Sequence, residues 1–173
     1  EYTNKFDNFS VESFQDLVVT PNQLEDSLKR IPESQRNALE HAANRIQKYH
    51  ERQVTSSWQY EDEDGSVLGQ KVTPLERVGI YVPGGKANYP SSMLMLAIPA
   101  RVAGVKDIIA AVPTRYDTKN DLIFAAAKVA GGNQVLTMGG AQAIGALAYG
   151  TKTLEKVDKI AGPGNVYVNV AKR

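Results

Sequence analysis

The C-terminal part of the chain alternates short apolar runs with helix-like segments, and this alternation restricts the fold more than any other feature. Apolar runs typical of buried strands occur at Val78–Val82, Asp107–Val112, Gln134–Met138 and Val157–Ala161. Segments with helical spacing follow them at residues 91–103, Asp121–Ala130 and Ala141–Tyr149, and another helix begins at Asn165. Units of about 25–30 residues that alternate in this way predict a parallel, doubly wound α/β sheet.

The first 76 residues follow a different pattern, and we predict a helical arm and a β-hairpin there. Residues 1–20 are irregular, with a short helix or strand near Phe14–Val19. A short helix capped by Thr20 or Asn22 and a long helix over residues 33–52 come next, separated by Pro32. Residues 57–73 alternate around Asp64-Gly65, which predicts a hairpin. We therefore place a domain boundary between residues 1–76 and 77–173.

Two further expectations concern the hairpin segment, and a third concerns the first helix after residue 77. The acidic run at residues 61–64 lacks the spacing of an EF-hand, so we interpret it as a solvated turn. Trp58 is expected to pack in an interface or under the long helix. The helix after the first strand of the sheet is expected to be capped by Ser91 or Ser92.

Three glycine-rich turns follow predicted strands: "VPGG", "MGGAQAI" and "AGPGN". In a parallel sheet such turns lie at the carboxyl edge, where ligands bind. Tyr81 ends its strand, where its ring could stack on a base or ribose, and Gln142 and Asn165 place amides at helix starts. The chain has neither G-x-G-x-x-G nor a P-loop motif, and glycine is also common in tight turns. Nucleotide binding and simple turn chemistry therefore both remain open.

Charge is divided unevenly along the chain. Residues 1–76 hold 14 acidic and 8 basic residues, a net −6, whereas residues 77–173 hold 5 acidic and 12 basic residues, a net +7. The basic half would attract an anionic ligand such as a dinucleotide, or simply balance the acidic half. The basic residues are scattered, so we predict no nucleic-acid partner. With no long apolar run and no cysteine, we expect no membrane association and a cytoplasmic location.

Residues with obvious catalytic chemistry are few. The two histidines, His41 and His50, are nine positions apart on one predicted helix and so face nearly opposite sides. Ser91 and Ser92 have no adjacent histidine, and no spacing supports Lys86 or Tyr89 as an acid or base. From the residues alone we assign no catalytic residue and no metal ligand, and predict a ligand-binding platform.

Longer blocks resemble a known family. The stretches "PLERVGIYVPGGKANYPSSMLMLAIPARVAGVKDIIAAVPT", "MGGAQAIGALAYGT" and "VDKIAGPGNVYVNVAKR" resemble histidinol dehydrogenases in composition, order and spacing. The resemblance is continuous from about Trp58 to Arg173 and weaker before it. It implies incomplete Rossmann-like domains in a homodimer, which is the fold class we expect: an incomplete Rossmann-like parallel sheet with flanking helices, preceded by a helical arm and a hairpin.

The resemblance also implies an activity. The family oxidises L-histidinol to L-histidine through an aldehyde, the last steps of histidine biosynthesis, with zinc and two NAD+ molecules. Its NAD-contacting positions correspond here to Tyr81 of "GIYVPGG", Gln142 of "GGAQAI" and Asn165 of "GPGN". These are the three residues that the strand ends already suggested.

The chain differs from the family in length, and this difference bears on the activity that we expect. Family members are much longer, and their zinc ligands and catalytic Glu-His pair follow the "GPGNVYV" block, where this chain stops at Arg173. Neither His41 nor His50 matches them. We expect an N-terminal portion that is inactive alone. Two alternatives stay open: a stand-alone nucleotide-binding module, and a dimerisation fragment without a ligand.

Overall fold

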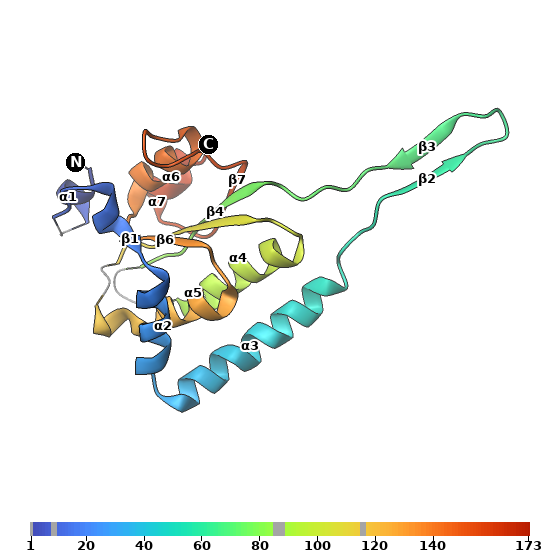
Figure 1. The fold of residues 1–173 in the computed structure, drawn as a ribbon. Helices are drawn as coiled ribbons and strands as arrows, with labels where there is room; N and C mark the ends of the chain where they lie inside the picture. Colours follow the sequence, from blue (N-terminus) through green and yellow to red (C-terminus); the bar gives the residue numbers. More distant parts are fainter. Residues whose placement is uncertain (1, 8–9, 85–88, 115–116) are drawn as a thin grey trace.

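The computed structural model describes residues 2–7, 10–84, 89–114 and 117–173. A body of helices and one sheet carries a two-stranded hairpin that projects far from it (Figure 1). No described helix is both long and apolar enough to cross a membrane.

The helices are α1 (Tyr2–Phe6), α2 (Pro21–Arg30), α3 (Glu33–Glu51), α4 (Pro90–Val102), α5 (Asp121–Ala130), α6 (Gly140–Tyr149) and α7 (Val166–Ala171). The strands are β1 (Val18–Val19), β2 (Trp58–Glu61), β3 (Val67–Gln70), β4 (Arg77–Tyr81), β5 (Asp107–Ala111), β6 (Gln134–Leu136) and β7 (Lys159–Ala161).

The sheet has the strand order β1-β6-β5-β4-β7. Strands β4 to β7 are parallel, as the alternation predicted, whereas β1 pairs antiparallel with β6. The chain moves outward from β4 through β5 to β6 and then returns to place β7 on the other side of β4. This reversal is the arrangement of a Rossmann-like sheet, so the predicted fold class is confirmed.

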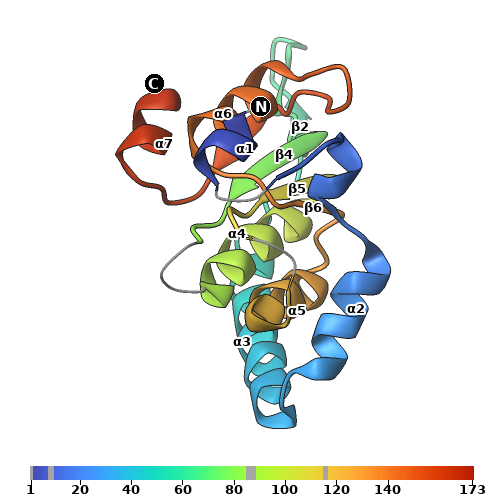
Figure 2. The same ribbon diagram turned by 90° about the vertical axis from the view of Figure 1, so that its left-hand side faces the viewer.

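Each face of the sheet is covered by different helices. Side chains alternate along β4, so that Ile80 joins the core under α4 and α5 and Tyr81 joins the core under α6 and α7. Figure 2 shows α4 and α5 on one side of the strands and α6 and α7 on the other. Helices α2 and α3 pack outside α5 and α4 and contribute Leu24 and Leu39 to the first core.

The predicted helices occur, with small changes at their ends. Helix α2 begins after Thr20, whose hydroxyl accepts from the backbone N–H of Gln23 while the Gln23 side chain accepts from Thr20, a capping box. The expected short helix or strand near Phe14–Val19 is present as a 3₁₀ helix at Phe14–Leu17 followed by β1, whereas α1 was not predicted. The expected serine cap on α4 is wrong. Tyr89 is the N-cap without a side-chain bond, and Pro90 opens the helix because its missing N–H is not needed there.

The predicted hairpin is also present. Gly65 has a φ of +79°, and the Asp62 carboxylate accepts from the backbone N–H groups of Asp64 and Ser66, which closes the turn. Every residue of β2 and β3 is exposed, including Trp58, which keeps 53% of its surface accessible. The expectation that Trp58 lies under the long helix is therefore wrong, because the hairpin points away from the body (Figure 1).

The arm and the sheet are nevertheless packed together. Strand β1 extends the sheet, and Arg30 of α2 forms two bonds to Asp121 at the start of α5: Nε to Oδ2 at 2.8 Å and Nη2 to Oδ1 at 2.7 Å. Asp121 is buried, and the Arg30 guanidinium lowers its pKa below the ordinary range of an aspartate. The boundary between residues 1–76 and 77–173 stays a prediction, and the two segments share one core.

Candidate functional site

The topology marks one place on the sheet edge as the natural ligand site. Strands β4 and β7 are parallel neighbours, yet the helices that follow them, α4 and α7, lie on opposite faces. The loops at their carboxyl ends therefore diverge, which opens a crevice at such a switch point in α/β sheets. Tyr81 is the last residue of β4, Asn165 follows β7, and Gln142 lies in the first turn of α6. The structure thus brings all three predicted residues to this edge.

The glycines of these loops have a packing role. Gly162 has a φ of +129°, and a Cβ there would lie 2.1 Å from the backbone oxygen of Tyr81. A Cβ on Gly139 would lie 2.2 Å from the Cβ of Pro113. Both distances are far below van der Waals contact. The loop after β7 can approach the backbone of Tyr81, and the loop after β6 can pack against Pro113, only because these positions lack side chains.

Tyr81 is buried at the centre of this edge. Only 3% of the residue is exposed, and its hydroxyl accepts from the backbone N–H of Gly140 at 3.2 Å. Burial raises the pKa of Tyr81, so the phenol is protonated at neutral pH and keeps its own O–H to donate. The predicted stacking of the ring on a base or ribose does not fit this burial. The assignment of Tyr81 as an NAD contact stays a prediction.

Gln142 has a partner that the sequence did not indicate. Its Nε2 donates to Oδ2 of Asp7 at 3.2 Å. Burial raises the pKa of Asp7. The two residues are 135 positions apart, and Asp7 belongs to no motif, so only the folded chain reveals the contact.

Asn165 also lies at the carboxyl edge of the sheet, but its side chain bonds within its own helix. Its Oδ1 accepts from the backbone N–H of Val168 at 3.1 Å and so caps α7. Lys172, at the end of α7, donates from Nζ to the carbonyl oxygen of Gly162 and holds the helix against its loop. Among the described residues, Tyr81 and Gln142 are joined through the Gly139-Gly140 turn, whereas the Asn165 side chain makes no hydrogen bond to either.

The described residues do not fit a zinc site. They contain no group of three His, Cys, Asp or Glu side chains that could hold a metal ion. His41 and His50 lie on α3, away from the switch point, and His50 shares a hydrogen bond with Gln53. Of the acid and base candidates, Tyr89 precedes α4 and Lys86 lies outside the described residues.

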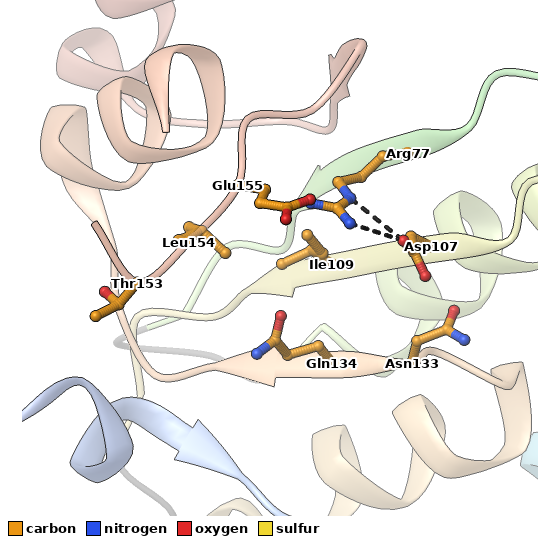
Figure 3. A pocket seen from close by; sticks show the side chains of 8 residues that line it. All are labelled: Arg77, Asp107, Ile109, Asn133, Gln134, Thr153, Leu154 and Glu155. Carbon is orange, nitrogen blue, oxygen red and sulfur yellow. Dashed lines mark hydrogen bonds and ion pairs between the residues drawn. The ribbon is translucent and has the colours of Figure 1, made fainter. Parts of the chain in front are cut away.

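A cavity of about 290 Å³ lies at the opposite, amino-terminal edge of the sheet (Figure 3). Arg77, the first residue of β4, bonds there to Asp107 at 2.9 Å and to Glu155 at 2.5 Å. Both carboxylates raise the pKa of Arg77, so the guanidinium is already neutralised within the chain. The position and the ion pairs indicate that Arg77 connects β4 to β5 and to the segment before β7. We do not assign a ligand to this cavity.

Comparison with known proteins agrees with this architecture. The family model described as histidinol dehydrogenase matches residues 1–173. Histidinol dehydrogenases of Neisseria gonorrhoeae and Pseudomonas putida are each 58% identical over all 173 residues. The crystal structure of histidinol dehydrogenase from Elizabethkingia anophelis matches 99% of the chain at 37% identity, with a TM-score of 0.89.

These relatives are longer than the chain. It spans 40% of the Neisseria gonorrhoeae protein and 39% of the Elizabethkingia anophelis chain. The match is nonetheless complete over the sequence, and sheet, loops and helices correspond together. This chain belongs to the histidinol dehydrogenase family.

Proposed function

We propose that these residues form the NAD-binding part of an enzyme that oxidises L-histidinol to L-histidine with two NAD+ in histidine biosynthesis. Family membership supports the reaction, and the placement of three predicted NAD contacts supports the role of this part. The observation that carries the proposal is that Tyr81, Gln142 and Asn165 all lie at the carboxyl edge of the parallel sheet, where the Tyr81 hydroxyl also accepts from the turn that begins α6.

The donor set fits a dinucleotide. A hydroxyl from Tyr81 and amides from Gln142 and Asn165 are uncharged groups suited to ribose hydroxyls, phosphates and the carboxamide of nicotinamide. Bound NAD+ supplies a hydride acceptor. The residues of this chain bind and orient it, and the glycine-lined loops allow the backbone to come close. The described residues contain no group of three His, Cys, Asp or Glu side chains that could hold zinc, and we derive no catalytic step from them.

A homodimer is part of the same proposal. The hairpin exposes Trp58, Tyr60 and Leu68, which lie on one face because residue 58 pairs with 70 and residue 60 with 68. A free two-stranded hairpin is marginally stable in water, so a second copy that covers this face would stabilise it. A cytoplasmic location fits a biosynthetic enzyme of this kind.

Calorimetric titration of NAD+ into the 173-residue chain tests the proposal. Replacing Gln142 or Asn165 with Ala removes one hydrogen-bonding amide and should weaken binding by about 1 kcal/mol, or roughly fivefold. Gln134→Ala is the matched control, because Gln134 carries the same amide at the opposite edge of the sheet. Equal weakening by all three variants, or by none, would contradict the assigned cofactor contacts.

A turnover assay separates the remaining interpretations. We expect no NADH from L-histidinol, NAD+ and zinc with this chain alone, because the described residues offer no group of three side chains that could hold zinc. NAD+ binding without turnover supports the dinucleotide-binding part of the enzyme or a stand-alone module. Absence of NAD+ binding with persistent self-association favours a dimerisation role, and genuine turnover would overturn our assignment of the chemistry elsewhere.

A further inference from the structure

The first residues of the chain pack beside the candidate site. Helix α1 packs against α6, and Thr3 within it is only 7% exposed. The side chain of Asn4 exchanges two hydrogen bonds with the backbone of Val11, at 2.9 and 2.8 Å, which fixes the path of this segment. Asp7 is therefore presented to α6 by a packed segment rather than by a free tail.

Asp7 meets α6 at a helix start that lacks its own cap. Gly139 is the N-cap residue and has no side chain to accept from the first turn. The Asp7 carboxylate lies beside this helix start, where its Oδ2 accepts from Nε2 of Gln142 at 3.2 Å. The Gly140 N–H, in the first turn of α6, donates to the Tyr81 hydroxyl at 3.2 Å. One turn thus links Asp7, Gln142 and Tyr81.

The same turn leaves room for the Gln142 amide. Gly140 has a φ of +63°, and a Cβ there would lie 2.5 Å from Oε1 of Gln142. The amide therefore folds back over Gly140, with its nitrogen directed to Asp7 and its oxygen over the glycine. A glutamine without these two neighbours would rotate about three side-chain bonds, and a ligand would have to order it on binding.

We propose that Asp7 is a positioning residue for Gln142: its carboxylate holds the Gln142 amide in one orientation at the dinucleotide site. This inference rests on the proposed function for its consequence in NAD binding, although the orientation itself is a property of the chain. In this proposal Asp7 does not touch the cofactor and acts on it only by orienting Gln142. A residue far from every motif in the sequence thereby becomes part of the site.

The first test needs no ligand. The side-chain NH2 signals of Gln142, identified in an NMR spectrum by their loss in Gln142→Ala, report the environment of that amide. In the unaltered chain they should be displaced from the free-amide position and protected from exchange. Asp7→Ala should return them to the free position, whereas Asp7→Asn, which keeps an acceptor oxygen, should leave them displaced. Unchanged signals in Asp7→Ala would overturn the proposal whether or not NAD binds.

The second test measures NAD+ affinity in the same variants. Asp7→Ala should weaken binding about three- to tenfold, the size expected when one long side chain must be ordered by the ligand. Asp7→Asn should bind like the unaltered chain. In the Gln142→Ala background, Asp7→Ala should have no further effect, because a residue that acts through Gln142 loses its influence with it.

A control variant, a folding check and two contradicting outcomes complete the test. Glu12→Ala removes an exposed carboxylate from the same part of the chain and should change neither the amide signals nor the affinity. Thermal unfolding of each variant shows whether it is folded. Tighter NAD+ binding by Asp7→Ala would mean that Asp7 blocks the donors of α6 and would overturn the positioning role. Failure of the unaltered chain to bind NAD+ would contradict the proposed function, while the amide signals still decide the role of Asp7.

Discussion

At the scale of single residues, the Arg30–Asp121 pair joins the arm to the sheet. The Asp121 side chain is 9% exposed and the Arg30 side chain 38%, and Ser27 beside them is fully buried. Asp121→Asn keeps the shape but removes the charge, so we expect a loss of about 1–3 kcal/mol in the free energy of unfolding. Urea unfolding measures it. Asp26→Asn on the exposed side of α2 is the control and should change stability by less than about 0.5 kcal/mol.

The same pair predicts a pH dependence. Because Arg30 lowers the folded-state pKa of Asp121, its stabilisation is fully present above the ordinary aspartate pKa of about 3.9. It is lost as the pH falls below that value and through the lower folded-state pKa. The stability difference between the unaltered chain and Asp121→Asn should therefore shrink on acidification. A difference that stays constant down to acidic pH would assign the effect to packing instead of charge.

Gly162 gives a second test at this scale. Its φ of +129° and the 2.1 Å approach of a Cβ to the Tyr81 oxygen both oppose any side chain. Gly162→Ala should lower the free energy of unfolding by about 1–3 kcal/mol. Gly145→Ala is the matched control: it lies inside α6 with nothing within 4 Å of a Cβ and should stabilise the chain by about 0.5–1 kcal/mol. Thermal unfolding of both variants measures the contrast, and equal effects would contradict the packing role.

At the scale of elements, the hairpin is independent of the body. All residues of β2 and β3 are exposed, and Figure 1 shows both strands beyond the end of α3. Leu68→Ala should therefore change the stability of the body by less than about 0.5 kcal/mol. Leu147→Ala, in the buried face of α6, should cost about 2–5 kcal/mol because it opens a cavity beside Gly79. A large loss on truncating Leu68 would mean that the hairpin packs against the body.

At the scale of the whole molecule, apolar surface is exposed in two places. One is the hairpin face with Trp58 and Leu68, and the other is α7, where Tyr167 and Val170 are 70% and 63% exposed. We expect concentration-dependent self-association by light scattering, since exposed apolar patches mark association sites. The chain has one tryptophan, so its fluorescence reports the hairpin alone and should shift to shorter wavelength as copies associate. Tyr60→Ser should weaken association, and a monomer at every concentration would contradict the proposed dimer.

The candidate site could be predicted only in part. The position of Tyr81, Gln142 and Asn165 at one edge could be predicted because strand ends and helix starts are local patterns, and parallel strands bring their ends to one edge. The burial of Tyr81, the cap that Asn165 forms and the contact of Gln142 with Asp7 were not predicted. Each depends on which loop packs against which, and no local pattern carries that information.

The sequence by itself determined the parallel α/β class, most helix and strand limits, and the hairpin turn at Asp64-Gly65. It did so because periodicity, caps and turn residues act within a few positions of the chain. Only the tertiary structure decided that β1 joins the sheet beside β6, that Trp58 stands away from the body, and that Asp7 reaches α6. These contacts join residues far apart in the chain, and their energy comes from packing that exists only once the whole chain is folded.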